Sequence, residues 1–389
     1  MSTGPLRGVR ILDATLFMVG PWSSMLLGAM GAEVLHVEQP DVDWSRLSGS
    51  IPPTINGTSI GYITWNMNKR GVFIDFKNES DQTFAHHLVE TADVFVCNMR
   101  PGVAERLGMS YEELSSINPR LIYCSATGYG RTGPRAKDRG SDNTVQAMSG
   151  FWSTQGKRGE PGEAYRHYTQ LDAQTGNTVA QAILLGLFAR QRTGKGQRID
   201  VTMFDAAATL QLPRITEYLD GQVHEPQGSS AFATAPNRAF RCEDGKWVGV
   251  AVTSDAEWVR LCTVLGDEVL SSEPRFKSNS DRVRNRGALE ERLIPLFAAH
   301  PQAYWLLHLR KHLVPVGAPM DWETIRNHRQ VVENDYVVEV ETEAWGKVWT
   351  GGPPWRFSKT PARVTGTPTP GEATFELWEE VDRREGAVR

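Results

Sequence analysis

The sequence is poor in cysteine, has no long apolar run and carries no surplus of charge of one sign. Its 389 residues include four cysteines, none of them in a CxxC pair, which argues against a disulfide scaffold and against a metal site of that kind. No apolar run approaches the roughly 20 residues that span a bilayer. The formal net charge of -4 argues against nucleic-acid binding as the main function. We therefore expect neither a membrane nor a nucleic acid as a partner.

The first residues and the cysteines indicate a cytoplasmic protein. The run MSTGPLRGVRILDAT lacks a basic region followed by the apolar core of a signal peptide. Cys97 and Cys124 lie in apolar, strand-like runs and are expected to be small buried residues. His308 and His312 stand four residues apart on a predicted helix. A leucine follows the first histidine and cations fill the interval, so no metal site is predicted.

The length indicates more than one domain, because a single hydrophobic core rarely extends over 389 residues. The composition, 40% hydrophobic and 23% charged, is typical of a globular enzyme. We expect a large domain over residues 1–220, a linker or loop over 221–235, and a small domain over 236–330. A hairpin signal around the turn EDG, followed by helical patterns, predicts α+β structure for the small domain. Residues 331–389 are expected to return to the large domain.

Alternating strand and helix signals predict an α/β fold with a Rossmann-like large domain. Residues 8–13 and 33–38 are apolar strand patterns, and a helical pattern at 21–31 connects them. The first turn lacks the glycine fingerprint of dinucleotide binding. Residues 128–133, GYGRTG, match GxGxxG formally. Pro134 and polar residues follow, so no helix begins there to hold a pyrophosphate, and dinucleotide binding is not expected.

The stretch from Tyr168 to Ala206 joins an acidic residue to an apolar helix, a basic glycine turn and a strand at 199–203. After Asp172, apolar residues recur at helical spacing as far as Phe188. Asp172 therefore lies at or just before a helix N-terminus. It is either an N-cap that accepts backbone N–H groups, or a carboxylate kept ionised by the helix N-terminus and able to act as a nucleophile. The two roles are compatible, and the local sequence does not choose between them.

Two further motifs place polar or cationic side chains beside predicted strands. The run NMRPG at 98–102 places an amide and a guanidinium after a strand, at the sheet edge where α/β proteins bind ligands. The forked donors of Arg106 suit a phosphate, although a surface arginine on a short helix is the alternative. Lys69 and Arg70 precede a predicted strand at 71–76, and two adjacent cations in that position are usually just solvated.

These motifs resemble those of the class III CoA-transferases, the family of formyl-CoA transferase, carnitine CoA-transferase and α-methylacyl-CoA racemase. The runs TGKGQRIDVTMFDA, NKRGVFIDF and NMRPG occur in the family's order, and the resemblance extends from GVRILDAT to FSKTPARV and GEAT. It implies an enzyme that moves coenzyme A from an acyl-CoA, with succinyl-CoA as a candidate donor, to a free carboxylic acid. Asp172 would form an aspartyl anhydride and then an aspartyl-CoA thioester, with no cofactor beyond the CoA thioester itself.

The resemblance also implies which residues bind the substrates. The implied CoA-binding residues are Lys69, Arg70, Asn98, Met99, Arg106, Arg139 and Met203. Among them, Lys69 and Arg70 are implied as candidates for binding its phosphates. The implied acyl pocket includes Met18, which replaces a glutamine of formyl-CoA transferase and makes the pocket less polar. Gly228 belongs to a loop at 227–233 that matches the glycine loop closing over the site in formyl-CoA transferase, and it is the only glycine retained there. A lid function for this loop stays open, and no metal ligand is implied.

Alternatives remain for the function and for the assembly. The family forms interlocked dimers, as homodimers or as heterodimers with a homologous subunit, so a non-catalytic CoA-binding subunit is one alternative. The retained Asp172 argues against it. An acyl-CoA racemase is a weaker alternative, because Ser141 occupies the position of the histidine in the racemase branch and that chemistry needs two titrating groups. Asp142 alone is expected to be structural.

The acceptor acid is not determined by the sequence. Twelve tryptophans and Met18 favour a bulky or aromatic acid, although tryptophan is more often a packing residue. Arg166 or His167 could instead pair with a second carboxylate, as in a substituted succinate. Both classes of acceptor therefore remain open.

Overall fold

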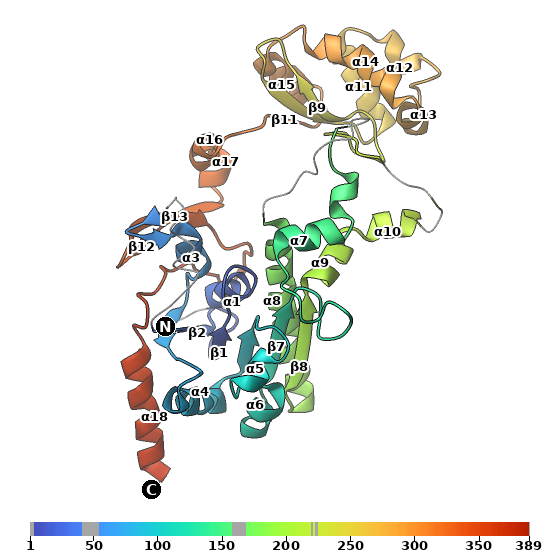
Figure 1. Ribbon diagram of the computed structural model, residues 1–389. Helices are drawn as coiled ribbons and strands as arrows, with labels where there is room; N and C mark the ends of the chain where they lie inside the picture. Colours follow the sequence, from blue (N-terminus) through green and yellow to red (C-terminus); the bar gives the residue numbers. More distant parts are fainter. Residues whose placement is uncertain (1–3, 41–53, 158–168, 219–220, 222–224, 389) are drawn as a thin grey trace. The chain divides into compact units, whose positions relative to one another are not determined.

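The chain folds into two compact units (Figure 1). The computed structural model describes residues 4–40, 54–157, 169–218, 221 and 225–388. The large unit takes in Met1–Phe151, Arg166–Gln222 and Arg329–Arg389, and the small unit takes in Trp152–Tyr165 and Val223–His328, as far as these are described. Most of the expected linker thus lies in the small unit. Among the described helices, none is both long and apolar enough to cross a membrane.

Six parallel strands form the sheet of the large unit, in the order β5-β2-β1-β6-β7-β8. The strands are β1 (Arg10–Ala14), β2 (Glu33–Glu38), β5 (Arg70–Phe73), β6 (Val94–Cys97), β7 (Ile122–Thr127) and β8 (Gln197–Thr202). The chain runs outward from β1 to β5, returns to β6 beside β1, and continues outward to β8. The strand order therefore reverses between β1 and β6, which is where open α/β sheets bind ligands. The predicted Rossmann-like α/β fold is confirmed.

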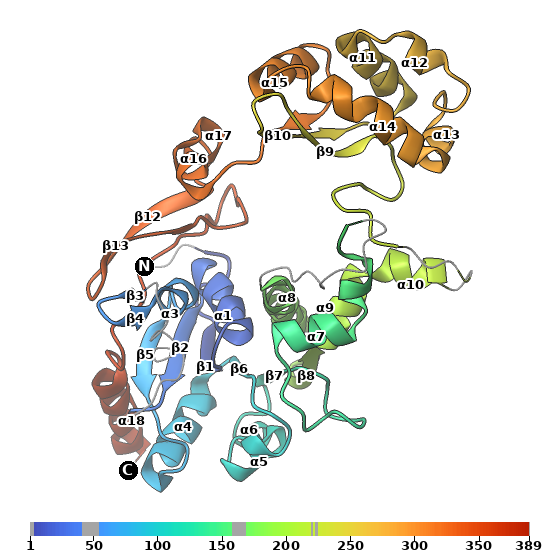
Figure 2. The same cartoon turned by 45° about the horizontal axis from the view of Figure 1, so that its top comes forward.

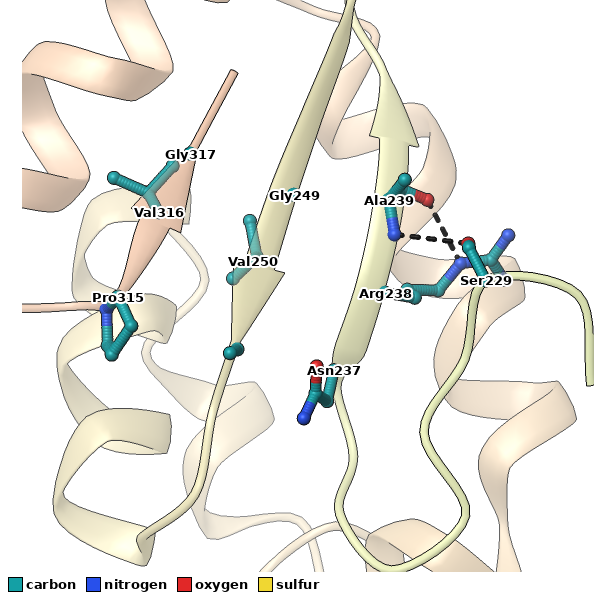
Figure 3. Close-up of a pocket in the computed structure, with 10 residues that line it drawn as sticks. Ser229, Asn237, Arg238, Ala239, Gly249, Val250, Pro315, Val316 and Gly317 are labelled. Carbon is teal, nitrogen blue, oxygen red and sulfur yellow. Dashed lines mark hydrogen bonds between the residues drawn. The ribbon is translucent and has the colours of Figure 1, made fainter. Parts of the chain in front are cut away.

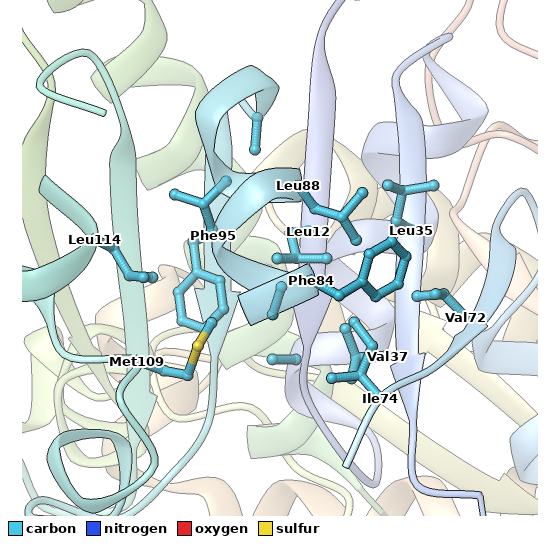
Figure 4. Packing of buried hydrophobic residues seen from close by; sticks show 14 of the residues in the cluster. Leu12, Leu35, Val37, Val72, Ile74, Phe84, Leu88, Phe95, Met109 and Leu114 are labelled. Atoms are coloured by element: carbon cyan, nitrogen blue, oxygen red, sulfur yellow. The ribbon is translucent and has the colours of Figure 1, made fainter. Parts of the chain in front are cut away.

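Helices cover both faces of this sheet, because its strands are apolar on both sides. On one face, α1 (Val19–Ala29) and α8 (Gln170–Thr193) pack in a cluster with Ile11 of β1. On the other face, α4 (Glu79–Thr91) and α18 (Thr374–Val388) pack in a second cluster with Leu12, the next residue of β1. Figure 4 shows Phe84 and Leu88 of α4 against Leu12 and its neighbours on β2 and β6. Successive strand side chains thus serve opposite layers.

The other elements of the large unit are short. The helices are α3 (Ile60–Trp65), α5 (Val103–Arg106), α6 (Tyr111–Ile117), α7 (Asp142–Met148), α9 (Met203–Leu210), α10 (Leu212–Tyr218) and α17 (Arg329–Val332). Two hairpins pair β3 (Thr54–Ile55) with β4 (Thr58–Ser59), and β12 (Val337–Thr342) with β13 (Gly346–Gly351). The strand expected at 199–203 is β8, and it ends one residue earlier. Thr202 ends it because its hydroxyl accepts the N–H of Asp205 at 2.8 Å, so Met203 begins α9.

The C-terminal segment crosses the free edge of the sheet at β5. The N–H of Ala373 donates to the carbonyl of Gly71 at 2.9 Å, and the N–H of Phe73 donates to Oγ1 of Thr374 at 2.9 Å. A Cβ on Gly71 would lie 2.9 Å from the backbone nitrogen of Gly371. The close approach of the two segments therefore requires glycine at position 71.

Ion pairs join α18 to the first strands of the chain. The guanidinium of Arg10 contacts Glu33 at 2.7 Å and Glu380 at 2.9 Å. Arg70 contacts the same Glu33 at 2.8 Å and Glu376 at 2.5 Å. These four contacts form a partly exposed network in which two arginines of the sheet share three carboxylates, two of them on α18.

The small unit has its own core around an antiparallel sheet of order β11-β10-β9 (Figure 2). The strands are β9 (Asn237–Arg241), β10 (Trp247–Ala251) and β11 (Val316–Gly317). The helices are α11 (Asp255–Leu265), α12 (Val269–Ser272), α13 (Asn279–Arg284), α14 (Arg286–Phe297), α15 (Gln302–Lys311) and α16 (Trp322–Asn327). Phe240, Trp258, Phe297 and Trp305 are buried together in this core. The unit is α+β, as expected.

Replacing Leu377 by alanine is expected to destabilise the large unit by about 3 kcal/mol, because the side chain is fully buried where α18 packs on the sheet. Phe375→Ala on the same helix is the matched control. Phe375 is exposed, so its loss should change stability by less than about 0.5 kcal/mol. Hydrogen exchange should accelerate in β5 and α4 of Leu377→Ala and stay unchanged in β9 and β10. Equal exchange in both variants would contradict the packing of α18 on this core.

Candidate active site

The segments that follow β1, β6 and β7 meet at the carboxyl edge of the large-unit sheet. Because β1 pairs with β6 and β6 with β7, the residues that follow these strands begin side by side. The helix α8 leads into the parallel strand β8 and therefore begins at the same edge, as does α9, which follows β8. The sequence-predicted residues Met18, Asn98, Asp172 and Met203 all belong to segments at this edge.

Asp172 lies in the first turn of α8, and a second aspartate holds its backbone. The helix begins at Gln170, after Thr169, whose φ of 49° is left-handed. Asp172 is therefore inside the helix, and the interpretation of Asp172 as the N-cap residue is wrong. The N–H groups of Leu171 and Asp172 donate to Oδ2 of Asp142 at 2.9 and 3.2 Å. The carboxylate that satisfies the start of α8 thus comes from α7, 30 residues before Asp172.

Asp142 is a buried carboxylate, and its other oxygen is bonded too. Its side chain is 3% exposed, and Oδ1 accepts from Nε2 of Gln146 at 2.6 Å. Asp142 thus provides the acceptor for the N–H groups of both Leu171 and Asp172. Sequence analysis expected a structural role for Asp142 but missed this contact, since no local pattern reports a partner 30 residues away.

A small apolar cluster lies under the first turn of α8. It joins Val145 of α7, Leu171 of α8 and Met203 of α9, with Val19 of α1 packed against them. Met203 is 5% exposed. The side chain of Met203 therefore belongs to this cluster rather than to an open surface, and the predicted contact with CoA stays a prediction without support from its burial.

The helices α1 and α8 approach closely beside Asp172. A Cβ on Gly176 would lie 2.9 Å from the carbonyl oxygen of Val19 and 2.9 Å from the ring of Trp22, so only glycine fits at this position of α8. The indole N–H of Trp22 donates to Oδ1 of Asn177 at 3.1 Å. The loop that precedes α1 is thereby fixed next to the start of α8.

In that loop, residues 15–18, the exposed apolar side chains are not that of Met18, for which the sequence predicted a place at the acyl pocket. Met18 is the residue before α1 and is only 6% exposed, whereas Leu16 and Phe17 are 39% and 57% exposed. Phe17 also has a φ of 66°, a conformation that costs energy for a residue with a Cβ. The prediction that Met18 lines an open acyl pocket finds no support in its burial. Leu16 and Phe17 are the exposed apolar side chains of this loop.

Asn98 binds the same loop through both atoms of its amide. Its Oδ1 accepts the N–H of Leu16 at 3.0 Å, and its Nδ2 donates to the carbonyl of Leu16 at 2.6 Å. Met99, the next residue, packs partly against the core under α4. The structure thus gives the side chain of Asn98 a role in shaping the loop. Its predicted contact with CoA, and that of Met99, stay predictions.

Two predicted cations lie exposed on this side of the sheet. Arg106 is on α5, and its Nε donates to the carbonyl of Gly102 at 3.2 Å. Arg139 is exposed in the segment between β7 and α7, next to Ser141. The hydroxyl of Ser141 caps α7 by accepting the N–H of Thr144 at 3.4 Å. Arg106 and Arg139 are therefore accessible to a ligand phosphate, and their contact with CoA stays a prediction.

Lys69 is not accessible to a ligand, because its ammonium is buried inside the large unit. It contacts Oδ2 of Asp13 at 2.9 Å and donates to Oδ1 of Asn66 at 2.8 Å, and the side chains of Lys69 and Asp13 are both 0% exposed. Arg70 is engaged as well, by the two ion pairs with Glu33 and Glu376. Phosphate binding by either residue stays a prediction, and the structure provides other partners for both charges.

Asp13 is ionised in this buried cluster. Burial alone would raise the pKa of its carboxyl, but Lys69 and His36, together with the hydroxyl of Ser24, hold that pKa well below its usual range. Burial lowers the pKa of the Lys69 ammonium, and Asp13 opposes that shift. Because the carboxyl of Asp13 stays charged, the ammonium has a fixed counter-ion, and the two form a buried ion pair.

Gly228 lies in the small unit, in a segment that α14 holds. It has a φ of 60°, and its N–H donates to the carbonyl of Gly156 at 2.9 Å. The hydroxyl of Ser230 donates to Glu290 of α14 at 2.8 Å, and Arg286 donates to the carbonyl of Phe232 at 2.9 Å. These bonds attach the described part of the segment to the small unit. The predicted substrate contact of Gly228 stays a prediction.

A hollow of about 540 Å³ lies beside this segment on the small unit (Figure 3). Ala239, Gly249 and Gly317 stand opposite one another on β9, β10 and β11 and contribute little side chain to it. Ser229 lines one side, and its hydroxyl accepts the N–H of Ala239 at 3.1 Å. The described lining of this hollow contains none of the residues that the sequence predicted for the site.

Two further sequence-based interpretations concern the binding of a second substrate carboxylate and the need for a metal ion. Arg166 and His167, considered for a second carboxylate, lie outside the described residues. In the part of the chain that is described, no group of three or more His, Cys, Asp and Glu side chains could hold a metal ion. The expectation that the reaction needs no metal remains a prediction.

Comparison with known proteins decides the family. Residues 6–374 match the family model described as CoA-transferase family III. The chain belongs to this family. The resemblance inferred from the motifs is thereby confirmed, and the protein is a class III CoA-transferase.

Individual relatives of this CoA-transferase cover nearly its whole length. The mouse succinyl-CoA:glutarate CoA-transferase is 33% identical over 392 residues, covering 100% of this chain and 89% of the mouse protein. The acetyl-CoA:oxalate CoA-transferase of Acetobacter aceti is 34% identical over 338 residues, 86% of each chain. The alpha subunit of the succinyl-CoA–L-malate CoA-transferase of Chloroflexus aurantiacus is 30% identical over 389 residues, 97% of this chain and 89% of that one. A CaiB/BaiF family protein from Brucella suis has a similar structure, with a TM-score of 0.86 and 30% identity, covering 97% and 100% of the two chains.

Asp142→Ala is expected to weaken the start of α8 in this CoA-transferase by about 1 to 2 kcal/mol, because the buried N–H groups of Leu171 and Asp172 lose their acceptor. The turnover rate should fall as well, since the first turn no longer holds Asp172 in place. Hydrogen exchange of the first turn of α8 and the rate of CoA transfer measure the two effects. Asn143→Ala, an exposed neighbour on α7, is the control. Unchanged exchange in Asp142→Ala would contradict the capping role.

Proposed function

We propose that this chain transfers coenzyme A from succinyl-CoA to a small dicarboxylic acid, with Asp172 as the nucleophile. The position of Asp172 carries the proposal: the residue lies in the first turn of α8, at the carboxyl edge of a sheet whose strand order reverses nearby. The relatives named above act on glutarate, oxalate and L-malate, which are all dicarboxylic acids, and two of them use succinyl-CoA. A bulky or aromatic acid is the alternative acceptor.

The first half of the proposed reaction loads the enzyme. A carboxylate oxygen of Asp172 attacks the thioester carbonyl of the donor, the carbon–sulfur bond breaks, and CoA leaves as a thiolate. The product is a mixed anhydride between Asp172 and the donor acid. A carboxylate is a weak nucleophile in water, so the advantage comes from its fixed position beside the thioester. The bonds from Asp142 to the backbone of the first turn supply this fixation.

The second half passes CoA to the acceptor. The thiolate attacks the aspartyl carbonyl, releases the donor acid and leaves an aspartyl-CoA thioester. The acceptor carboxylate attacks this thioester to form a second anhydride and free the thiolate. The thiolate then attacks the acceptor carbonyl, which completes the acyl-CoA product and regenerates Asp172. Each tetrahedral oxyanion requires N–H donors at the site, and no oxidant, reductant or net proton is consumed.

The proposed reaction requires no cofactor beyond the CoA thioester that is its substrate. Arg106 and Arg139, both exposed, are the proposed cations for the phosphates of CoA, for which a forked guanidinium is well suited. The four cysteines are buried thiols without a disulfide, which supports the proposed cytoplasmic location.

Asp172→Asn is expected to abolish CoA transfer, with a loss of at least about 10⁴-fold, because an amide cannot form the anhydride. Asp382→Asn, an exposed residue of α18, is the control with full activity. Wild-type protein incubated with succinyl-CoA and then reduced with borohydride should carry an alcohol in place of the carboxyl on the peptide that contains Asp172. Full activity of Asp172→Asn would overturn the assignment. If the enzyme transferred CoA to aromatic acids and not to dicarboxylic acids, the proposed dicarboxylic acceptor would be wrong.

We also infer that the protein pairs with a second copy of itself. The helix α8 presents Leu185 and Phe188, which are 68% and 58% exposed, and Leu212 and Ile215 of α10 are exposed as well. Large exposed apolar side chains on helices of a folded unit are typical of an interface. These residues therefore support a dimer. The alternative is a heterodimer with a homologous subunit, since one of the relatives is an alpha subunit.

In solution the mass is expected to be about twice the 43.3 kDa of one chain. Phe188→Asp should raise the dissociation constant of the dimer by about tenfold or more, because a charge replaces an exposed aromatic anchor. Phe375→Asp, on the exposed side of α18, is the matched control. Sedimentation velocity at several concentrations measures the change. A wild-type chain that stays monomeric would contradict the homodimer and favour the heterodimer.

A further inference from the structure

We propose that Asp13 and Lys69 are positioning residues for the acyl-CoA substrate, and that they act through the loop at residues 15–18. The proposal rests on the proposed function, since it assigns a part in CoA binding to an ion pair that cannot touch a ligand. The family resemblance implied that Lys69 binds a phosphate of CoA directly. In the structure its ammonium is buried, so we infer that Lys69 affects CoA binding indirectly, through the loop.

Asp13 collects hydrogen bonds from five groups at the end of β1. Its Oδ2 contacts Nζ of Lys69 at 2.9 Å and Nδ1 of His36 at 3.2 Å, and accepts from Oγ of Ser24 at 2.6 Å. Its Oδ1 accepts from the N–H of Thr15 at 3.1 Å and from the hydroxyl of Thr15 at 2.5 Å. One buried carboxylate thus joins β2, α1 and the segment before β5 to the first residue of the loop.

Contacts with Gly20, Asn98 and the first turn of α1 fix the loop on its other sides. Thr15 packs on Gly20 so closely that a Cβ there would lie 2.2 Å from its side chain. Leu16 is bonded to Asn98 at both its N–H and its carbonyl. The carbonyl of Met18 accepts the first N–H bond of α1. Phe17 is left between these contacts, with a φ of 66° and its ring exposed. A conformation of this cost persists only where the surroundings enforce it, and such residues gather at functional sites.

An ion pair in this position is not explained by stability. Taking two charges out of water costs several kcal/mol for each ion, and apolar residues of similar size often stabilise a core as well or better. An apolar pair, however, would offer no acceptor to Thr15. The carboxylate of Asp13 provides it, and Lys69 keeps that carboxylate charged. The arrangement therefore fixes the position of the loop rather than adding to the core.

The loop lies where a CoA thioester must come. It follows β1 at the reversal of strand order, and α1, which begins after it, packs against Leu171, the residue before Asp172. The exposed side chains Leu16 and Phe17 are apolar, which suits the uncharged pantetheine arm rather than the phosphates. Moving this loop should therefore weaken the hold on the arm without affecting any phosphate contact.

Equilibrium binding of three probes to the full-length protein tests the proposal. The probes are CoA, 3′-dephospho-CoA and pantetheine, and the variant is Lys69→Met, which keeps the apolar stem and removes the charge. We expect the dissociation constant to rise by about tenfold for all three probes, since a shift of the loop acts on the shared arm. A loss for CoA that disappears with 3′-dephospho-CoA or pantetheine would show a direct phosphate contact and overturn the proposal.

A purely structural role gives a different result. In that case Lys69→Met lowers the fraction of protein able to bind and leaves the dissociation constants unchanged, which also overturns the proposal. The double variant with Phe17→Gly provides a further check. If Lys69 acts through the loop, Lys69→Met should weaken binding by less than about twofold once the ring is absent, because the two changes are coupled. A full tenfold loss in that background would contradict the route through the loop.

Thr15→Val covers the case in which Lys69→Met does not fold. It removes one of the two hydrogen bonds from Thr15 to Asp13, keeps the one from the backbone N–H, and leaves the buried ion pair intact. Binding of the three probes should weaken by an equal, smaller factor of about threefold, whereas unchanged binding would count against the proposal. Wild-type protein that binds none of the probes would overturn the proposed function itself. If the wild-type protein binds the probes and the variants bind them with the same dissociation constants, only the positioning role is overturned.

Discussion

The pairing of β1 with β6 is the constraint on which the candidate site depends. These two central strands run parallel, with Ala14 opposite Cys97, so the residues that follow them leave the sheet at the same point. One exit leads to the loop 15–18 and α1, and the other leads to Asn98. The amide of Asn98 joins the two exits directly. The pairing of these two strands therefore places the loop 15–18 and Asn98 side by side at the carboxyl edge of the sheet.

Much of the fold could be predicted from the sequence, because it is encoded in local patterns. Strand and helix periodicity gave β1, α1 and β2 to within a few residues, and the motif runs gave the family. The contact of Asp142 with the start of α8 could not be predicted in this way. The side chain of Asp142 joins α7 to α8, and the sequence of either helix alone gives no sign of this contact. The N-cap interpretation of Asp172 is wrong because α8 begins two residues earlier, at Gln170.

The candidate site was harder to predict where burial decides the role. Adjacent cations such as Lys69 and Arg70 look alike in the sequence, yet one ammonium is enclosed with Asp13 and one guanidinium is shared by Glu33 and Glu376. Met18 was expected at an acyl pocket, whereas its neighbours Leu16 and Phe17 are the exposed ones. The left-handed conformation of Phe17 changes which side chains of this loop face outward. The apolar run in the sequence does not indicate such a turn.

The ion pair between Arg10 and Glu380 joins positions 370 residues apart. During synthesis β1 is therefore made long before α18, which packs against its sheet. The stretch Val223–His328 of the small unit emerges in between and can form its core first. Until the last helix arrives, the edge at β5 and the apolar face under α18 stay open to other chains. The order of synthesis thus leaves the protection of these strands against aggregation to α18, which is made after them.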